Sequence, residues 1–174
     1  MESEVDSVKF KRGFTDRDEI DRCGKATREL RKLPLTIRDV SGMKLAPLLA
    51  EIRQLAARGI KHISVDYAQL VEGDGKSRSR EEEVAKVSRS LKASAKRNKV
   101  SIDLLSQLND DGKIRESRAI GFDADVVLLL HKNKPKGAAE YQRSIYCAKN
   151  RGGKRDWSVP VQFRGEFYQF SNAI

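Results

Sequence analysis

The chain has 174 residues, enough for one domain with a hydrophobic core, and 39% of them are hydrophobic while 34% are charged. Lys and Arg outnumber Asp and Glu by 35 to 25, and the net charge of +10 favours polyanions such as nucleic acid as partners, although a well-solvated surface explains it equally well. Two histidines and two distant cysteines argue against a zinc site, and no apolar run approaches the roughly 20 residues needed to span a bilayer.

The first third of the chain predicts two helices and a short strand. A helix over 15–33 has acidic residues in its first turn and a proline directly after its end, and Ile20, Cys23, Leu30 and Leu33 give it one apolar stripe. A short strand follows over 35–39. A second helix over 44–58 carries leucines and an isoleucine along one side and stops at a glycine. We interpret residues 1–59 as a helical and linking segment.

The remainder, 60–174, predicts alternating strands and helices. A strand over 60–66 precedes a helix that opens with the capping-box pattern Ser79-x-x-Glu82. Further strands are expected at 100–106, 124–130, 142–148, 158–163 and 166–170. This order indicates an α/β fold with a parallel sheet and antiparallel strands at its C-terminal end.

Two polar residues stand at predicted strand tips. Asp66 ends the strand Ile63-Ser64-Val65, and Gln107 follows the next strand. The carboxyl ends of parallel strands are where α/β sheets bind ligands, and a carboxylate there suits Mg²⁺, a hard cation that prefers oxygen. Without further context, however, Asp66 could equally cap a turn, and Gln107 could simply begin a loop.

Two basic groups follow. Lys113, Arg115 and Arg118, with Glu116 between them, lie in a loop whose cations could contact the phosphates of a single nucleic-acid strand. An exposed charged turn is the alternative. Lys149 and Arg151, two residues apart on a strand, are expected on one face, where they either bind an anion or belong to a solvated edge strand.

The motifs, taken in their order, resemble the motor domain of DnaB-type replicative DNA helicases, a RecA-like ATPase. The residues that carry the resemblance are Val65-Asp66-Tyr67-Ala68-Gln69-Leu70, Leu105-Ser106-Gln107-Leu108-Asn109, Arg115-Glu116-Ser117, Asp123-Ala124-Asp125-Val126-Val127 and Ala148-Lys149-Asn150-Arg151-Gly152. The resemblance implies a RecA-like, mostly parallel sheet flanked by helices, and its short loop is typical of phage and prophage members. Residues 60–174 would run from the Walker B strand to the arginine-finger region.

This resemblance implies a role for each candidate. Asp66 would hold Mg²⁺ through bound water, and Gln107 would sense the γ-phosphate of ATP. The segment with Lys113, Arg115, Glu116 and Arg118 would bind DNA, although Arg118 replaces the family's usual glycine. Lys149 and Arg151 would act in trans on a neighbouring subunit's nucleotide, although the glycines that follow depart from the family pattern.

One motif of the family does not occur. The 174 residues contain no Gly-x-x-x-x-Gly-Lys-Ser/Thr phosphate loop, so we expect an N-terminally truncated member without that loop, its strand or the catalytic glutamate. In the family that strand lies between the strand bearing Gln107 and the one at 124–130. Either these two strands pair directly, or the chain requires the missing piece.

The resemblance therefore implies the C-terminal part of an ATP-driven helicase that translocates on single-stranded DNA. It would use ATP and Mg²⁺, assemble as a hexameric ring or with a complementing helicase subunit, and hydrolyse no ATP by itself. The alternative is a non-enzymatic DNA-binding or ring-modulating subunit. The acidic N-terminal residues differ from a signal peptide, so we expect a cytoplasmic protein without a membrane partner.

Overall fold

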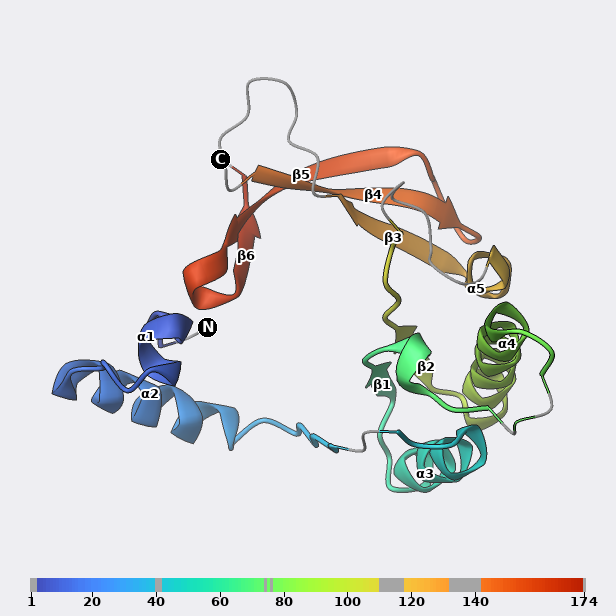
Figure 1. The fold of residues 1–174 in the computed structure, drawn as a ribbon, viewed down its shortest axis with the longest axis horizontal. Helices are drawn as coiled ribbons and strands as arrows, with labels where there is room; N and C mark the ends of the chain where they lie inside the picture. The colour runs from blue at the N-terminus through green and yellow to red at the C-terminus, as the bar shows by residue number, and fades with distance from the viewer. Residues whose placement is uncertain are drawn as a thin grey trace. The chain divides into compact units, whose positions relative to one another are not determined.

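The computed structural model describes residues 3–39, 42–73, 75, 77–109, 118–131 and 142–173 (Figure 1). The chain divides into two compact units, which are described separately. The terminal unit comprises Met1–Arg38, Leu128–Ala148 and Lys154–Ile174, and the central unit comprises Asp39–Val127 and Lys149–Gly153. Among the described residues, no helix has both the length and the apolar character required to cross a membrane.

The central unit has the predicted alternation of helices and parallel strands. Its elements are α3 (Leu45–Ala57), β1 (His62–Val65), the 3-10 helix η1 (Ala68–Leu70), α4 (Arg80–Asn98), β2 (Ser101–Leu104) and α5 (Arg118–Asp123). Strands β1 and β2 pair in parallel, with Val65 opposite Leu104, so their C-terminal tips lie side by side. This register brings the residues that follow the two strands together at one sheet edge.

A hydrophobic core joins α3 and α4 to this strand pair. Ile52 of α3 is 1% exposed and Val87 of α4 is fully buried, and Leu91 and Val100 belong to the same cluster. A second cluster places Ile120 of α5 against the buried residues of η1 and α4. Burying several branched side chains of this size gives the central unit its stability and holds the strand tips in place.

Helix α4 begins and ends as its sequence predicts. The Ser79 hydroxyl accepts a hydrogen bond from the Glu82 N–H (3.2 Å), while the Glu82 carboxylate accepts from the N–H of Arg78 (2.8 Å), one residue before the cap. Acidic residues occupy the first turn and basic residues the last, which favours the helix dipole at both ends. Lys99, in the left-handed conformation, terminates the helix.

Strand β2 carries Asp103, which would be costly in a strand buried on both faces. The side chain of Asp103 is 60% exposed, and its carboxylate lies 3.0 Å from Nε2 of His62 on β1. The strand therefore has one solvent-exposed face, and Asp103 needs no buried partner.

The terminal unit contains α1 (Ser7–Lys11), α2 (Arg17–Leu30) and η2 (Gly165–Phe167). Most of a four-stranded sheet also belongs to it, formed by β3 (Val126–His131), β4 (Gln142–Asn150), β5 (Trp157–Arg164) and β6 (Gln169–Asn172). The order is β3-β4-β5-β6, with β4–β5 and β5–β6 antiparallel, as predicted for the C-terminal strands. Strand β2 pairs with β1 and β3 with β4, so the direct pairing of β2 with β3 is not formed among the described strands.

Two expectations for the N-terminal segment are wrong. Helix α2 begins after Asp16 and ends at Leu30, shorter than the predicted 15–33, and residues 35–39 form no strand. The short helix α1 was not predicted from the sequence. The apolar stripe of this helix is not buried, since Ile20 is 55% exposed and α2 contains no buried residue. Its periodicity identified a helix correctly, but periodicity alone does not supply a packing partner.

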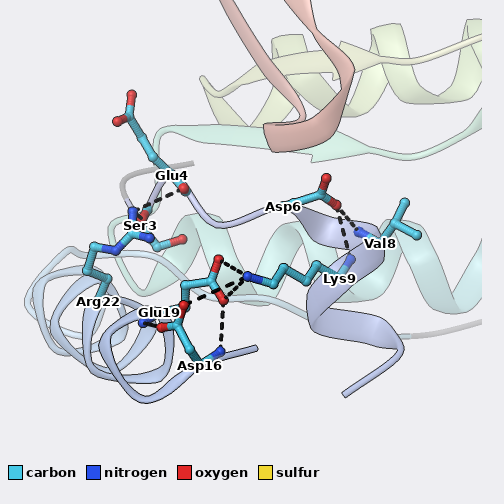
Figure 2. A network of polar contacts seen from close by, with 8 residues as sticks. All are labelled: Ser3, Glu4, Asp6, Val8, Lys9, Asp16, Glu19 and Arg22. Carbon is cyan, nitrogen blue, oxygen red and sulfur yellow. Dashed lines mark hydrogen bonds and ion pairs between the residues drawn. The ribbon is translucent and has the colours of Figure 1, made fainter. Parts of the chain in front are cut away.

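Polar contacts hold α1 against the start of α2. Figure 2 shows Lys9, Asp16 and Glu19 pointing toward one another, with the Lys9 ammonium 2.7 Å from the Glu19 carboxylate. Asp16 and Glu19 form a reciprocal capping box, in which each side chain accepts from the other's backbone N–H (2.8 and 2.9 Å). The Glu19 side chain is 12% exposed, so this ion pair is better shielded than a typical surface pair.

These contacts predict a pH-dependent stability. The pKa of the Glu19 carboxyl is lowered from its ordinary 4.5, chiefly by the hydrogen bond from Lys9. A carboxyl whose folded pKa is lowered stabilises the fold above its ordinary value, and this contribution is lost as pH falls. We expect Glu19→Gln to have a lower thermal midpoint than the native chain at pH 7, with the difference shrinking between about pH 5 and pH 3.

Circular dichroism melts across this pH range would measure the difference. Asp21→Asn, which neutralises an exposed carboxylate in the second turn of the same helix, is the matched control and is expected to show no such convergence. A difference between Glu19→Gln and the native chain that stays constant with pH would contradict the assignment.

Candidate functional site

The tips of β1 and β2 are connected by backbone hydrogen bonds. The Leu105 N–H donates to the Val65 carbonyl (3.0 Å), and the Ala68 N–H donates to the Leu105 carbonyl (2.8 Å). Asp66, between these contacts, is exposed, and the peptide bond that links it to Tyr67 is cis. The loop after β1 is thus fixed to the loop after β2, and the Asp66 carboxylate is accessible at the edge where sequence reasoning placed it.

Gln69 connects these two loops through its side chain. Its Nε2 donates to Oγ of Ser106 (3.0 Å), and its Oε1 lies 3.5 Å from the N–H of Gln107. The guanidinium of Arg80, in the first turn of α4, in turn donates to the Gln69 carbonyl. Gln69 was not among the sequence candidates, although it lies within the motif that carries Asp66. A polar residue inside an otherwise apolar run was the available signal.

Arg151 follows β4 and is held by Asp125, which lies between α5 and β3. The N–H of Arg151 donates to the Asp125 carbonyl (2.8 Å), and its Nη1 donates to Oδ1 of the Asp125 carboxylate (2.9 Å). Lys92 of α4 forms an ion pair with the other oxygen, Oδ2. The hydrogen bond from Lys92, and then the charges of Lys92, Arg151 and Lys149, lower the pKa of the Asp125 carboxyl, so the carboxylate is ionised at neutral pH.

Lys149 has a different partner. Its ammonium donates to the backbone carbonyls of Gly121 (2.9 Å) and Phe122 (2.8 Å), in the last turn of α5. A cation there satisfies carbonyls that have no partner within the helix and interacts favourably with its dipole. Although Lys149 and Arg151 lie two residues apart, Lys149 anchors α5, whereas the guanidinium of Arg151 stays 59% exposed beside Asp125.

The structure describes the predicted DNA-binding residues only in part. Lys113, Arg115 and Glu116 lie outside the described residues. Arg118 begins α5, and its side chain also lies outside the description. Helix α5 therefore connects the predicted DNA-binding segment, along the chain, to Asp125.

A metal site built from protein ligands alone is not found in the part of the chain that the structure describes. This part contains no group of three or more His, Cys, Asp or Glu side chains that could hold an ion. Mg²⁺ usually keeps several of its waters and takes only one or two protein carboxylates, with phosphate oxygens completing the shell. The single exposed carboxylate of Asp66 fits that mode of binding and does not fit an all-protein metal cage.

Comparison with known proteins places these features in a family context. The sequence profile described as "DnaB-like helicase C terminal domain" matches residues 1–172. A "Replicative DNA helicase DnaB" from Treponema pallidum is 33% identical over 178 residues, covering 97% of this chain and 40% of the relative. One from Leifsonia xyli is 35% identical over 157 residues, covering 80% of this chain and 34% of the relative.

Solved structures show the same fold. A structure described as an ATPase domain superposes with a TM-score of 0.86 at 25% identity, covering 99% of this chain and 67% of that one. A structure described as "The Structure Of A DnaB-Like Replicative Helicase And Its Interactions With Primase" gives a TM-score of 0.85 at 24% identity, covering 99% of this chain and 47% of that one. The α/β fold is thereby confirmed, and the chain spans less than half the length of the curated relatives from Treponema and Leifsonia.

Proposed function

Since the chain belongs to the DnaB-like helicase C-terminal domain family, we propose that it is the part of a replicative helicase motor that grips single-stranded DNA and completes a neighbouring subunit's ATP site. The exposed guanidinium of Arg151, anchored through its backbone beside Asp125, is the observation that carries this proposal. We further propose that it acts in the cytoplasm as a member of a ring, of the hexameric kind that the resemblance implies, or with a complementing helicase subunit.

The strand tips support a nucleotide-linked role. When bound, ATP and Mg²⁺ would supply the phosphoryl chemistry, and Asp66 would hold the ion through its water shell. Gln107 would sense the state of the nucleotide. Gln69 hydrogen-bonds to Ser106, beside Gln107, and lies three residues from Asp66. It would therefore hold Asp66 and Gln107 in fixed positions relative to each other.

Arg151 supports the trans role better than Lys149 does. A guanidinium offers a planar, permanently charged fork that can bind two phosphate oxygens, and this one is 59% exposed. Lys149 already donates to two carbonyls of α5. We therefore propose that Arg151 contacts the phosphate, and that Lys149 must leave α5 before it could do the same.

A second candidate function is a non-enzymatic subunit that binds DNA and modulates a ring. The absence of the phosphate-loop motif from the 174 residues favours it for this polypeptide alone. Both candidates share one consequence, namely that this chain by itself hydrolyses no ATP. They differ in whether its Arg151 stimulates hydrolysis by a phosphate-loop-bearing neighbour.

The DNA-binding part of the proposal predicts a salt-dependent affinity. Lys113→Ala and Arg115→Ala are each expected to weaken binding to an oligo-dT strand by about three- to tenfold, because each removes a phosphate contact. Each substitution should also lower the slope of log affinity against log salt by about 0.7. Fluorescence anisotropy at several salt concentrations measures both quantities.

Lys25→Ala is the matched control, since it removes one positive charge from α2, outside the segment around Arg115. It should change neither the affinity nor the slope beyond the small effect of net charge. Equal losses for all three variants would mean that binding follows total charge and not the segment around Arg115.

A further inference from the structure

Two cations from different elements converge on a single carboxylate in the central unit. Lys92 of α4 contacts Oδ2 of Asp125, and Nη1 of Arg151 lies 2.9 Å from Oδ1. The two positive groups are thus spaced to bind two oxygens of one oxyanion. Nothing in the sequence motifs had marked Lys92, which is one of several lysines on a long helix.

These ion pairs are exchangeable. The side chains of Lys92, Asp125 and Arg151 are 36%, 55% and 59% exposed. In ion pairs so accessible to water, the paired state is only a few-fold more populated than the separated state. Another anion can therefore displace the Asp125 carboxylate without disturbing the hydrophobic core.

The backbone around the pair is held by contacts that do not involve the Asp125 carboxylate. The Arg151 N–H donates to the Asp125 carbonyl, and the Lys149 ammonium holds the last turn of α5, two residues before Asp125. Lys92 lies in the middle of a 19-residue helix that packs against α5. The two cations would remain neighbours after their carboxylate rotates away.

We propose that Lys92 and Arg151 form a two-cation seat for one terminal phosphate of a nucleotide, and that Asp125 occupies this seat until such a phosphate displaces it. The inference rests on the proposed trans role of Arg151 and adds Lys92 as a second phosphate ligand. A terminal phosphate carries nearly two negative charges at neutral pH and several acceptor oxygens, so it competes well against a single carboxylate. Asp125 is then a competing anion, which pairs with the guanidinium and the ammonium while no phosphate is bound.

The test titrates inorganic tripolyphosphate into the full 174-residue chain by isothermal calorimetry at constant ionic strength. Asp125→Asn, which keeps the shape of the side chain and removes its charge, is expected to bind the probe about two- to fivefold more tightly than the native chain. Asp125→Glu, which restores the charge, should bind as the native chain does. Circular dichroism melts establish that each variant is folded.

Two further variants show which side chains are responsible for the increase in affinity. In the Asp125→Asn background, adding Lys92→Met or Arg151→Met should each remove the increase in affinity, because each deletes one cation of the seat. Asp156→Asn is the matched control, since Asp156 is a similarly exposed carboxylate paired with Arg155, and it should leave the affinity unchanged. If Asp125→Asn binds no more tightly, or if its gain survives Lys92→Met, the inference is overturned.

The outcome also separates this inference from the proposal on which it rests. Arg151→Met that leaves tripolyphosphate binding unaltered, in the native and in the Asp125→Asn background, would contradict Arg151 as a phosphate ligand and with it the trans role. If Arg151→Met weakens binding while Lys92→Met has no effect in either background, Arg151 remains a phosphate ligand and only the role of Lys92 is contradicted.

Discussion

Arg151→Ala is expected to lower ATP hydrolysis by about 10³-fold or more in a ring whose subunits carry a phosphate loop, because an arginine supplied in trans contributes that much to phosphoryl transfer. The guanidinium balances charge that develops on the transferred phosphate, and no lysine or alanine reproduces its planar fork. In the present chain the group is exposed, and its backbone is tied to Asp125, which places it for such a contact.

A chimera provides the assembly in which this can be measured. The region of the Treponema pallidum helicase that the match leaves out would be joined to the present chain, of which 97% aligns with that relative. Steady-state hydrolysis with saturating single-stranded DNA then compares the native chimera with Arg151→Ala. Arg155→Ala is the matched control, because it removes an arginine that is 68% exposed and lies close by in the sequence.

Mixed rings show whether the arginine acts in trans. A chimera with Arg151→Ala keeps its own nucleotide site, and a chimera with Asp66→Asn keeps its arginine. Mixing the two should restore part of the hydrolysis at interfaces where each supplies what the other lacks. If mixing restores nothing although mixed rings form, or if Arg151→Ala hydrolyses ATP as fast as Arg155→Ala does, the trans role is wrong.

The sequence was informative where a local pattern dictates the structure. The capping residues of α4 lie within a few positions of one another, and the parallel register of β1 and β2 follows from strands that must share a buried face. The sequence alone therefore sufficed to place Asp66 and Gln107 each after the end of a strand, while the structure brings the two strand ends together. The antiparallel order of β4, β5 and β6 followed in the same way from short connections.

Tertiary contacts decided what the sequence left open. The spacing of Lys149 and Arg151 indicated one face of a strand, but β4 ends at Asn150, and the partners of the two cations come from α5 and from the turn after it, 26 to 28 residues away. Asp125 lies within a motif but received no role, because an aspartate before an apolar strand has no distinctive pattern. Lys92 likewise has no sequence feature that distinguishes it from the other cations of α4.

The N-terminal segment shows the limit of such a pattern. Its apolar period indicated one apolar stripe on the first helix, and in the structure Ile20 and Leu30 of this stripe are 55% and 48% exposed. The sequence records that these positions are apolar but not which surface they contact. The polar network of Lys9 and Glu19, which does hold α1 to α2, depends on two residues ten positions apart and was not visible as a motif.

The second large effect concerns hydrolysis by this chain in isolation. Cradling the β- and γ-phosphates of ATP requires the backbone N–H groups and the lysine of a phosphate loop, and the 174 residues contain no such motif. A lone carboxylate, such as that of Asp66, would position a hydrated ion but would not hold the triphosphate. We therefore expect DNA-stimulated hydrolysis no faster than that of a buffer blank, with no further loss in Asp66→Asn.

The most direct test of the account is ATP hydrolysis by the purified, cooperatively folded chain with and without single-stranded DNA, beside Asp66→Asn. Both proteins are expected to give equal background rates under both conditions, while oligo-dT binding by the same preparation shows that the DNA-gripping part is functional. Hydrolysis that rises with DNA and disappears in Asp66→Asn would contradict this expectation, because the chain would then contain a complete nucleotide site of its own.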